Sequence, residues 1–341
     1  MSSDRMRFGI VGCGTIGKHH AKAISTLAQA ELAAVCDVQP ERAQQLAQQF
    51  GCDADRDFDA LLARDDIQAV SVCTPSGLHA EHGIAAAQAG KHVLSEKPLD
   101  IALDKIDRLI AVCEQQGVKL ACIFQHRFDP DARRVKRAIE EGKFGQLLLC
   151  NTAVLWYRAQ TYYDRDAWRG TWALDGGVLS NQAIHYLDQM LWLMGEVEEV
   201  TFAQIATRAR RMEAEDIAQA TVRFANGAWG AIQASTLTWP GATTRVEVYG
   251  TTGAAVLDAD NLTFYQVEGE EKIEAAGAAA AASLDPAVAQ LTGHDAQIAD
   301  FIAAVRENRD PYVTGREARR SVALLTDIYR QATGRAMLGG G

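Results

Sequence analysis

The first third of the chain alternates short apolar runs with segments whose apolar residues recur at the spacing of a helix. Short, fully apolar runs are typical of buried strands, and their alternation with helices is typical of a parallel sheet. The expected strands span residues 7–11, 31–36, 69–73, 91–95 and 119–124, and the expected helices span residues 15–27, 40–50, 57–63, 79–89 and 103–116. Residues 1–125 are therefore predicted to form an α/β domain of the Rossmann type, with a doubly wound parallel sheet.

From residue 126 the pattern changes, because long runs typical of strands follow one another without helices between them. Asn226-Gly227 is a strong hairpin signal between two of these runs. The expected strands span residues 147–158, 197–208, 217–224, 228–237, 244–249 and 254–257, after a helix at residues 131–141. Residues 126–341 are therefore predicted to form an α+β domain that binds substrate on a large, open, mostly antiparallel sheet.

Three further segments complete the second domain. Residues 162–194 are rich in Trp, Gly, Asn and His, and their later part, residues 181–194, has the 3.6-residue spacing of a helix. Residues 274–289 are rich in alanine and are expected to form a loop or a marginal helix without chemistry. Two helices, at about residues 295–307 and 316–333, are predicted to close the chain.

Composition and charge narrow the classes of partner. The chain has 341 residues, and its net charge of −10 without a clustered Lys/Arg run argues against nucleic acid or an anionic membrane and favours a small molecule. The seven cysteines form no C-x-x-C pair, as expected of core residues in a reducing compartment. No apolar run precedes the first strand or reaches the roughly 18 to 20 residues of a membrane span, so the protein is expected to be soluble and cytoplasmic.

Three glycines after the first expected strand indicate a cofactor site. In G-x-G-x-x-G the first glycine permits a tight turn, the second lets the backbone approach a pyrophosphate, and the third lets the helix pack closely. The expected phosphate-binding residues are Gly12, Gly14, Thr15, Ile16 and Gly17. Asp37 closes the second strand, where a carboxylate accepts hydrogen bonds from a ribose and repels a 2′-phosphate. The predicted cofactor is therefore NAD rather than NADP.

Two further strand ends carry polar residues, and ligands bind at the carboxyl ends of strands in an open parallel sheet. Thr74-Pro75 follows one strand, with His79 soon after, and Glu96-Lys97-Pro98 follows the next. A lysine after a strand is more often a solvated surface residue, but this position is at the ligand edge of the sheet. The candidate cofactor-binding residues here are Thr74, Pro75, His79, Glu96 and Lys97.

The glycine turn, Asp37, Glu96-Lys97-Pro98 and a later G-G-x-x-x-N-x-x-x-H pattern that ends at His185 resemble the Gfo/Idh/MocA family of nicotinamide-dependent oxidoreductases over essentially the full length. The resemblance implies an NAD-dependent dehydrogenase that acts on the CH–OH group of a sugar. Within the family, residues 162–185 most resemble the WlbA-type branch, which oxidises the 3-hydroxyl of UDP-N-acetylglucosaminuronic acid. Inositol dehydrogenases of the family have Asp four residues before the histidine, where this chain has Asn181.

Such a reaction needs a base that removes the hydroxyl proton while hydride leaves the carbon. Lys97 and His185 are the two candidate catalytic residues. The family pattern implies that Lys97 lies beside the nicotinamide, where desolvation and the positive ring lower a lysine pKa from about 10.4. A histidine such as His185 starts near 6.5 and titrates close to working pH. The sequence leaves open which of them takes the proton, and Asn181 cannot serve as the acid of an Asp–His relay.

Substrate contacts are expected from arginines that match carboxylate or phosphate, from amides, and from tryptophans that either stack on a sugar or fill the core. The candidate substrate-binding residues are Gln125, Arg127, Trp168, Arg169, Asn181, Gln182 and His185. No group of His, Cys and carboxylates has metal-ligand spacing, so no metal is expected. Packing or surface roles are expected of His19 and His20, and four histidines stay unassigned: His82, His92, His126 and His294.

Other functions remain open at this point. The same residues would serve an inositol or other polyol dehydrogenase, or a keto-sugar reductase that runs in the opposite direction, whereas a non-catalytic nucleotide sensor would need neither Lys97 nor His185. The open sheet is also expected to make a homodimer or homotetramer, because its uncovered face would otherwise leave apolar side chains in water. Alternating runs suggest Val222, Phe224, Trp229 and Ile232 for that face.

Overall fold

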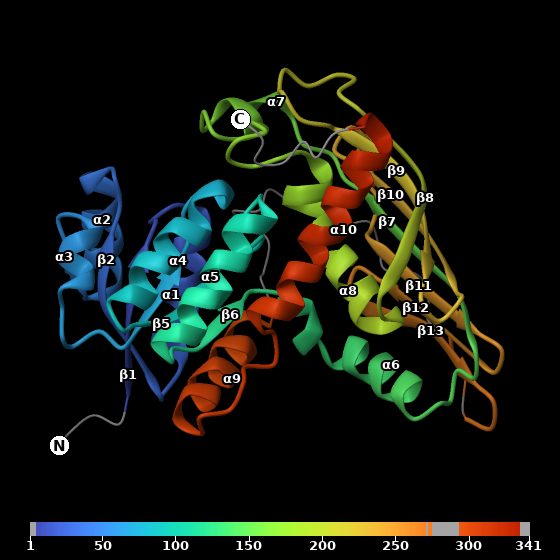
Figure 1. Cartoon of the computed structure of the whole chain (residues 1–341), viewed down its shortest axis with the longest axis horizontal. Helices are drawn as coiled ribbons and strands as arrows, with labels where there is room; N and C mark the ends of the chain where they lie inside the picture. Colours follow the sequence, from blue (N-terminus) through green and yellow to red (C-terminus); the bar gives the residue numbers. More distant parts are fainter. Residues whose placement is uncertain (1–4, 271, 275–292, 335–341) are drawn as a thin grey trace. The chain divides into compact units, whose positions relative to one another are not determined.

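The computed structural model describes residues 5–270, 272–274 and 293–334 (Figure 1). The alanine-rich segment expected at residues 274–289 thus lies, apart from its first residue, outside the described part. Contacts divide the described chain into two units, residues 5–125 with 293–319, and residues 126–270, 272–274 and 320–334. The predicted second domain differs from the second unit, because residues 293–319 belong to the first. Among the described helices, none has the length and apolar run needed to cross a bilayer.

The first unit contains a six-stranded parallel sheet with strand order β3-β2-β1-β4-β5-β6. Its strands are β1 (Met6–Val11), β2 (Ala30–Cys36), β3 (Asp53–Ala54), β4 (Ala69–Val72), β5 (His92–Ser95) and β6 (Leu120–Cys122). The order reverses direction at β1, which is the switch point where doubly wound sheets bind ligands. The predicted Rossmann sheet is therefore confirmed.

Helices connect these strands, as the alternating pattern predicted. They are α1 (Thr15–Thr26), α2 (Pro40–Phe50), α3 (Phe58–Leu62), α4 (His79–Gln88), α5 (Leu103–Gln116) and α9 (His294–Arg306), with short 3-10 turns η1 (Ser76–Leu78) and η2 (Gln125–Phe128). Helix α9 corresponds to the helix predicted at about residues 295–307, but it packs against α1 in this unit and not in the second domain, where it was expected. Its Phe301 ring lies 6.3 Å from that of Phe8 in β1. Apolar residues of α9 thus complete the core of the Rossmann unit.

The second unit contains an eight-stranded sheet with order β14-β13-β12-β11-β7-β10-β9-β8, in which only the β7–β10 pair is parallel. Its strands are β7 (Leu147–Leu155), β8 (Val197–Ala206), β9 (Ile217–Phe224), β10 (Trp229–Ser235), β11 (Arg245–Gly250), β12 (Gly253–Asp258), β13 (Asn261–Val267) and β14 (Ile273–Glu274). The expected mostly antiparallel sheet is confirmed, as is the hairpin at Asn226-Gly227. Strands β13 and β14 were not predicted.

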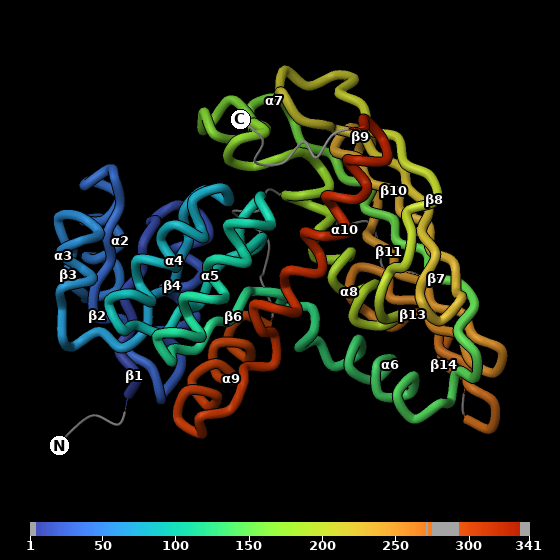
Figure 2. The backbone as a smooth tube through the Cα atoms, viewed as in Figure 1, coloured from blue at the N-terminus to red at the C-terminus, as the bar shows by residue number. Residues whose placement is uncertain are grey.

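Helices lie on one face of this sheet, as Figures 1 and 2 show for α6 and α8. The remaining described helices are α6 (Pro130–Glu140), α7 (Gln160–Asp164), α8 (Ile184–Met194) and α10 (Gly315–Thr333), and a single π-helical turn, η3 (Leu179–Ala183), leads directly into α8. The helix predicted over residues 181–194 thus begins as a π turn. Such turns occur frequently at functional sites.

The prediction for the uncovered face of the sheet needs correction. Val222, Phe224 and Ile232 are buried on the helical side, where a Cβ at Gly230 would lie 3.4 Å from Met190 of α8. Of the four predicted residues, only Trp229 is on the other face. The reason is the two-residue period of a strand, since Trp229 and Ile232 are an odd number of residues apart and point to opposite faces.

Candidate functional site

The turn after β1 has the shape that a dinucleotide phosphate needs. Gly12 has a φ of +95°, and a Cβ there would lie 2.5 Å from the Cys73 carbonyl oxygen. A Cβ on Gly17 would collide with the Gly12 carbonyl oxygen, whereas no atom lies within 4 Å of the Cβ position of Gly14. The first and third glycines are thus required by close packing, and the second leaves an open approach to the backbone.

The N-terminus of α1 adds electrostatic support to this turn. No side chain caps the helix, and its first turn, which contains Thr15 and Ile16, has no acidic residue. Its N–H groups therefore face no competing carboxylate there, and together with the positive end of the helix dipole they favour an anion. The geometry fits the pyrophosphate of NAD.

Asp37 follows β2 and is fixed by the backbone. The Cys13 N–H donates to its Oδ2 (2.7 Å), and the Gln39 N–H donates to its Oδ1 (2.8 Å). Each carboxylate oxygen has a second lone pair, so Asp37 can still accept hydrogen bonds from a ribose. The next residue, Val38, is 98% exposed and carries no positive charge that would bind a 2′-phosphate. These residues fit NAD, whose nicotinamide ring supplies the hydride acceptor when it is bound.

The turns that follow β4 and β5 are joined by a buried histidine. His79 Nδ1 lies 2.6 Å from the Pro98 carbonyl oxygen, and its Nε2 lies 2.7 Å from the Thr74 carbonyl oxygen. Burial lowers the pKa of His79, although both hydrogen bonds oppose that effect. The structure therefore gives His79 the task of holding the turns at Thr74-Pro75 and Lys97-Pro98 together, rather than that of a group exposed to the cofactor.

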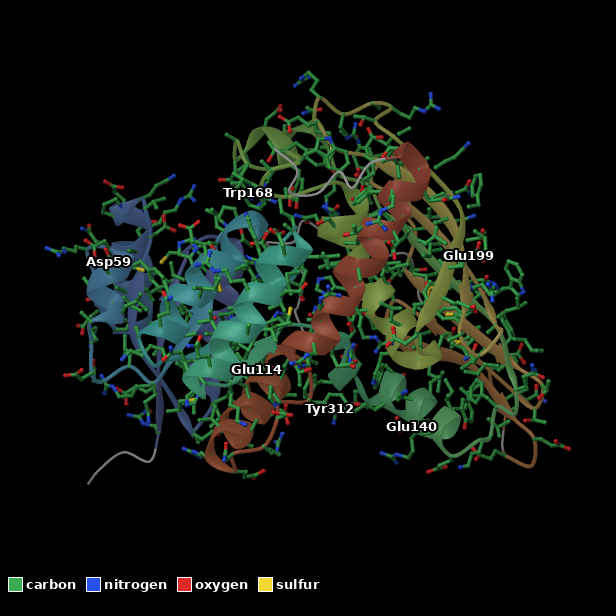
Figure 3. The ribbon with its side chains drawn as sticks, in the orientation of Figure 1. Asp59, Glu114, Glu140, Trp168, Glu199 and Tyr312 are labelled. Carbon is green, nitrogen blue, oxygen red and sulfur yellow. The ribbon has the colours of Figure 1, made fainter. Side chains whose placement is uncertain are left out.

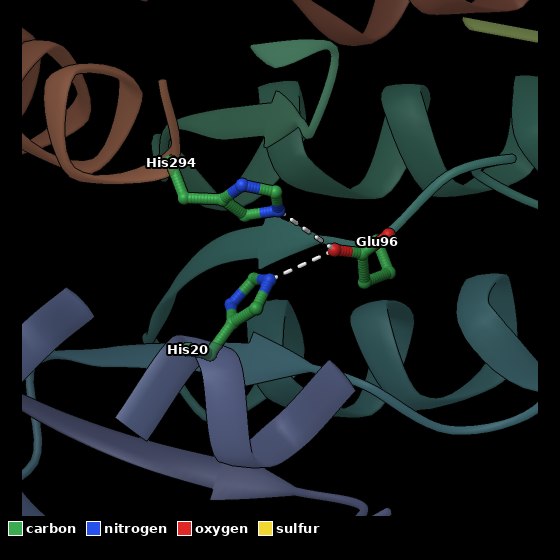
Figure 4. A group of neighbouring side chains, drawn as sticks. All are labelled: His20, Glu96 and His294. Atoms are coloured by element: carbon green, nitrogen blue, oxygen red, sulfur yellow. Dashed lines mark hydrogen bonds and ion pairs between the residues drawn. The ribbon is translucent and has the colours of Figure 1, made fainter. Parts of the chain in front are cut away.

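Glu96 is the centre of a buried group with two histidines (Figure 4). His20 Nε2 donates to Glu96 Oε1 (2.8 Å), and His294 Nε2 lies 3.8 Å from the same oxygen. The other carboxylate oxygen accepts the Lys97 N–H (3.1 Å). The carboxylate of Glu96, a predicted cofactor-binding residue, thus contacts His20 and fixes the backbone of Lys97.

Glu96 and His20 stabilise each other's charged form. Burial raises the pKa of Glu96, but the hydrogen bond from His20 and the nearby ring of His294 outweigh burial and hold that pKa well below its usual value. Burial lowers the pKa of His20, while Cys73 and Glu96 raise it to about 10. The packing role predicted for His20 is therefore that of a buried ion pair. His294 was left unassigned because α9 brings it to this place from a distant part of the sequence.

Two groups of possible metal ligands occur among the described residues, although spacing along the chain indicates neither. Ligand atoms of His20, Glu96 and His294 lie within 4.8 Å of one another, as do those of His126, Asp129 and Asp260. In both groups a histidine nitrogen is 3.0 Å or less from a carboxylate oxygen. Contacts of that length are direct hydrogen bonds, and we assign no ion to either group.

The π turn and α8 place the candidate residues of the second unit. His185 is the second residue of α8 and is half-buried. The Asn181 side chain donates its Nδ2–H to Asp175 and accepts from Gln182 Nε2 (3.0 Å) and the Tyr162 hydroxyl (3.3 Å). An aspartate at position 181 would place two carboxylates in contact. The neighbouring Asp175 therefore explains the asparagine without any reference to a substrate.

Arginines gather around the ring of Tyr162. The same segment contains Trp168, which Figure 3 labels. The Arg169 guanidinium lies 4.4 Å from the ring centre of Tyr162 and 4.6 Å from that of Trp168. Arg158 and Arg165 lie 5.7 and 5.9 Å from the Tyr162 ring. Three guanidinium groups thus surround one aromatic ring; Arg158 is buried, and Arg169 also pairs with Asp166 (3.2 Å).

Arg127 requires a correction. Its side chain is 2% exposed, its Nε donates to Asp188 Oδ2 (2.7 Å), and its Nη2 donates to Asp188 Oδ1 (2.7 Å). A bidentate pair with a carboxylate uses the same atoms that would bind a substrate anion. The structure therefore gives Arg127 a structural role. Gln125 is also buried, at the end of the Rossmann unit beside Gly293.

Family models match both parts of the chain. Residues 6–124 match the model described as an oxidoreductase family with an NAD-binding Rossmann fold, and residues 132–256 match the GFO/IDH/MocA C-terminal domain. The two matches together cover more than half of the residues. Their order along the chain is the order of the two sheets.

Solved structures and a curated relative are similar over most of the chain. The WlbA dehydrogenase of Bordetella pertussis, in complex with NADH and UDP-GlcNAcA, is 38% identical, with a TM-score of 0.85 over 96% of each chain. The WlbA dehydrogenase of Chromobacterium violaceum, in complex with the same two ligands, is 31% identical, with a TM-score of 0.88 over 98% of this chain and 96% of that one. Inositol 2-dehydrogenase of Rhizobium meliloti is 32% identical over 74% of this chain and 76% of its own.

Proposed function

This chain belongs to the Gfo/Idh/MocA family of NAD-dependent oxidoreductases, and on that premise we propose that it oxidises the 3-hydroxyl of UDP-N-acetylglucosaminuronic acid. In this reaction the hydride on C3 reduces NAD to NADH, and the hydroxyl proton passes to a base of the protein. The sugar becomes a 3-keto sugar, because C3 loses a hydride and its oxygen loses a proton, which together are two electrons and two protons.

The observation that carries the proposal is the extent of the match to dehydrogenases solved with a nucleotide sugar. Two WlbA dehydrogenases with NADH and UDP-GlcNAcA align with 96% and 98% of this chain. The inositol 2-dehydrogenase of Rhizobium meliloti aligns with 74%. The longer matches leave only 4% and 2% of this chain unaligned.

The charges around Tyr162 support an anionic substrate. A nucleotide sugar acid has a carboxylate and a diphosphate, and a protein with net charge −10 must meet them with local cations. Arg158, Arg165 and Arg169 supply such cations, and guanidinium groups match carboxylate and phosphate oxygens. Trp168 beside Arg169 offers a flat surface to a sugar ring.

We propose that Lys97 or His185 accepts the hydroxyl proton. The hydrogen bond from the Lys97 N–H to Glu96 fixes the lysine backbone, and the π turn before α8 fixes the start of the helix that bears His185. Asn181 cannot take up a proton, so the acid that inositol dehydrogenases use at that position is not available here. The amides of Asn181 and Gln182 are proposed to contact substrate hydroxyl or carboxylate groups.

Oxidation of inositol is the second candidate, because the 32% identity to an inositol 2-dehydrogenase extends over three quarters of the chain. A panel assay separates the two. We expect NADH formation with UDP-N-acetylglucosaminuronic acid to exceed that with myo-inositol or free glucuronate. Replacing Lys97 with Met should lower turnover by roughly 10²-fold to 10⁴-fold, the usual contribution of a positioned acid or base. Activity confined to an unmodified polyol would refute the nucleotide-sugar proposal.

We also propose that the uncovered face of the eight-stranded sheet joins copies of this chain as a homodimer or homotetramer. Trp229 is 50% exposed and is paired in the sheet with Leu149, which is 46% exposed. Phe202 of β8 is 44% exposed on the same sheet. Such a group of apolar side chains is typical of a contact surface.

Light scattering at micromolar concentration tests this surface. The wild-type protein should have the mass of two or four chains, and Trp229→Lys should shift the mass toward that of one chain. Tyr312→Lys is the matched control, because Tyr312 is 42% exposed but belongs to the Rossmann unit. A wild-type protein with the mass of a single chain would contradict the proposal.

A further inference from the structure

A second histidine lies against His185. The ring of His126, from η2, lies 5.4 Å from that of His185 between centres, at 88°. The same ring is stacked on Tyr186, with centres 5.1 Å apart and planes 29° from parallel. Two consecutive residues of α8 therefore contact His126, and the plane of its ring is defined by both contacts.

Two carboxylates hold one nitrogen of His126. Its Nδ1 lies 3.0 Å from Asp129 Oδ2 and 3.2 Å from Asp260 Oδ1. Carboxylate oxygens accept hydrogen bonds, so Nδ1 bears a proton that it donates to Asp129, while Asp260 Oδ1 makes an ion-pair contact with the same nitrogen. Asp129 directly precedes α6, and Asp260 lies in the turn between β12 and β13. Three separate segments thus meet at one imidazole.

The backbone that brings Asp260 to this place has an unusual conformation. Ala259 has a φ of 46° and Asp260 has a φ of 68°. Residues other than glycine seldom adopt positive φ, and an alanine there costs about 1–3 kcal/mol. The second oxygen of Asp260 faces the Tyr186 hydroxyl at 3.5 Å. The backbone of this turn is therefore strained, and the strained conformation directs the Asp260 carboxylate at His126.

The charges around His126 favour its cationic form. Burial lowers the pKa of His126, but Asp260, Asp129 and, more weakly, Asp188 raise it above its ordinary value. The charge of Asp188 is balanced by its bidentate pair with Arg127. Burial raises the pKa of Asp260, and the positive ring of His126 opposes that shift. The group thus holds one positive ring between two carboxylates.

We propose that His126, held by Asp129 and Asp260, is a positioning residue for His185, which it orients by ring contact and shields from the two carboxylates. This inference rests on the proposed role of His185 as a proton acceptor. A base must be neutral before it takes the proton. One buried and one half-buried carboxylate without a cation between them would stabilise protonated His185 and withdraw it from that role. The positive ring of His126 cancels part of their field.

The titration of His185 tests the proposal without any substrate. Protein labelled with carbon-13 in its histidine rings is titrated by NMR, and the His185 resonance is identified by its loss in His185→Gln. Two variants remove the charge of His126 in different ways: His126→Gln keeps a donor for the carboxylates, and His126→Phe keeps the aromatic ring. In each, the His185 titration should move to higher pH by about one unit. Either variant suffices if the other does not fold.

Two further variants make the result specific. His126→Phe combined with Asp129→Asn and Asp260→Asn removes all the charges of the group, and should return the His185 titration to near its wild-type position. Asp258→Asn, in the strand just before the same turn, is the matched control and should change nothing, because the charged partner of Asp258 is Arg245. A His185 titration that stays at its wild-type pH in His126→Gln and His126→Phe would overturn the proposal. Absence of sugar oxidation by the wild-type protein would instead refute the proposed function and leave this titration interpretable.

Discussion

At the scale of single residues, Asn181 shows how one atom changes the chemistry that a position can perform. Its Nδ2–H donates to Asp175, which is buried and also accepts the Gly170 N–H (2.8 Å). With oxygen in place of that nitrogen, the donor is lost and two carboxylates face each other. The asparagine therefore maintains the loop before α8 and at the same time removes a proton acceptor from the neighbourhood of His185.

Asn181→Asp should consequently destabilise the protein at neutral pH. We expect the free energy of unfolding in urea to fall by about 1–3 kcal/mol at pH 7.5, the cost of a buried group that loses its partner. The loss should shrink at pH 5, where the two carboxyl groups can share a proton. Asn226→Asp is the control, because the Asn226 side chain donates to the Met194 carbonyl oxygen and not to a carboxylate. Equal stability of Asn181→Asp and wild type at pH 7.5 would show that Asp175 does not require the amide.

The residues that a short sequence pattern can identify were identified from the sequence. The glycine turn and Asp37 are joined by local geometry, so fixed spacing reveals them. The partners of Glu96 and of His126 are different, because His294 and Asp260 reach them only through the packing of distant segments. No spacing rule predicts such pairs. The same limitation made Arg127 appear to be a substrate ligand, since its partner lies on another helix.

At the scale of elements, one buried carboxyl group joins three segments of the second unit. Glu215, just before β9, accepts the Leu179 N–H of η3 (3.0 Å) and the Tyr329 hydroxyl of α10 (2.8 Å). Its carboxylate also occupies the space where a Cβ on Gly177 would lie. Burial raises the pKa of Glu215 to about 7, although both hydrogen bonds oppose that shift. The π turn that precedes His185 therefore rests on a group that titrates near neutral pH.

The direction of this pKa shift predicts how stability depends on pH. Between the ordinary value of 4.5 and about 7 the folded state holds a proton that the unfolded state releases. The contribution of Glu215 to stability therefore falls as pH rises through this window, by about 1.4 kcal/mol for each unit of pH. Glu215→Gln keeps an oxygen that accepts both hydrogen bonds but cannot titrate. The difference between wild type and Glu215→Gln in urea unfolding should decrease from pH 5 to pH 7, and a constant difference would contradict the assigned shift.

Strands and helices with a clear pattern of apolar residues, either a regular spacing or an unbroken run, were predicted well. Elements without such a pattern were not. Strands such as β2 and β4 of the Rossmann sheet are almost fully buried and read as continuous apolar runs, which is why their positions agree with the structure, whereas the two-residue, exposed β3 was not predicted. Helix α7 was missed because it has only five residues, and the seven-residue strand β13 was missed because its buried and exposed positions do not alternate regularly. The uncovered face of the second sheet was assigned to the wrong residues, since alternation identifies two faces without showing which one the helices cover.

At the scale of the whole molecule, the Rossmann unit and the second unit are not two consecutive pieces of the chain, because residues 293–319 return to the Rossmann unit. Helix α9 follows the second sheet in sequence, yet Ile298, Phe301 and Ile302 belong to the core of the Rossmann unit. His294, at the start of that helix, reaches Glu96 beside the candidate catalytic lysine. The C-terminal segment thus helps to build the site that carries Lys97, and truncation before α9 would disturb it.

The central claim is that this protein removes hydride from C3 of a nucleotide sugar acid. UDP-N-acetylglucosaminuronic acid that bears deuterium at C3 alone, incubated with the protein and NAD, tests it most directly. We predict that the deuterium appears at C4 of the nicotinamide ring in the NADH formed, in equal amount to a 3-keto sugar, as mass spectrometry would measure. NADH without deuterium, or no NADH from this substrate while myo-inositol is oxidised, would contradict the account.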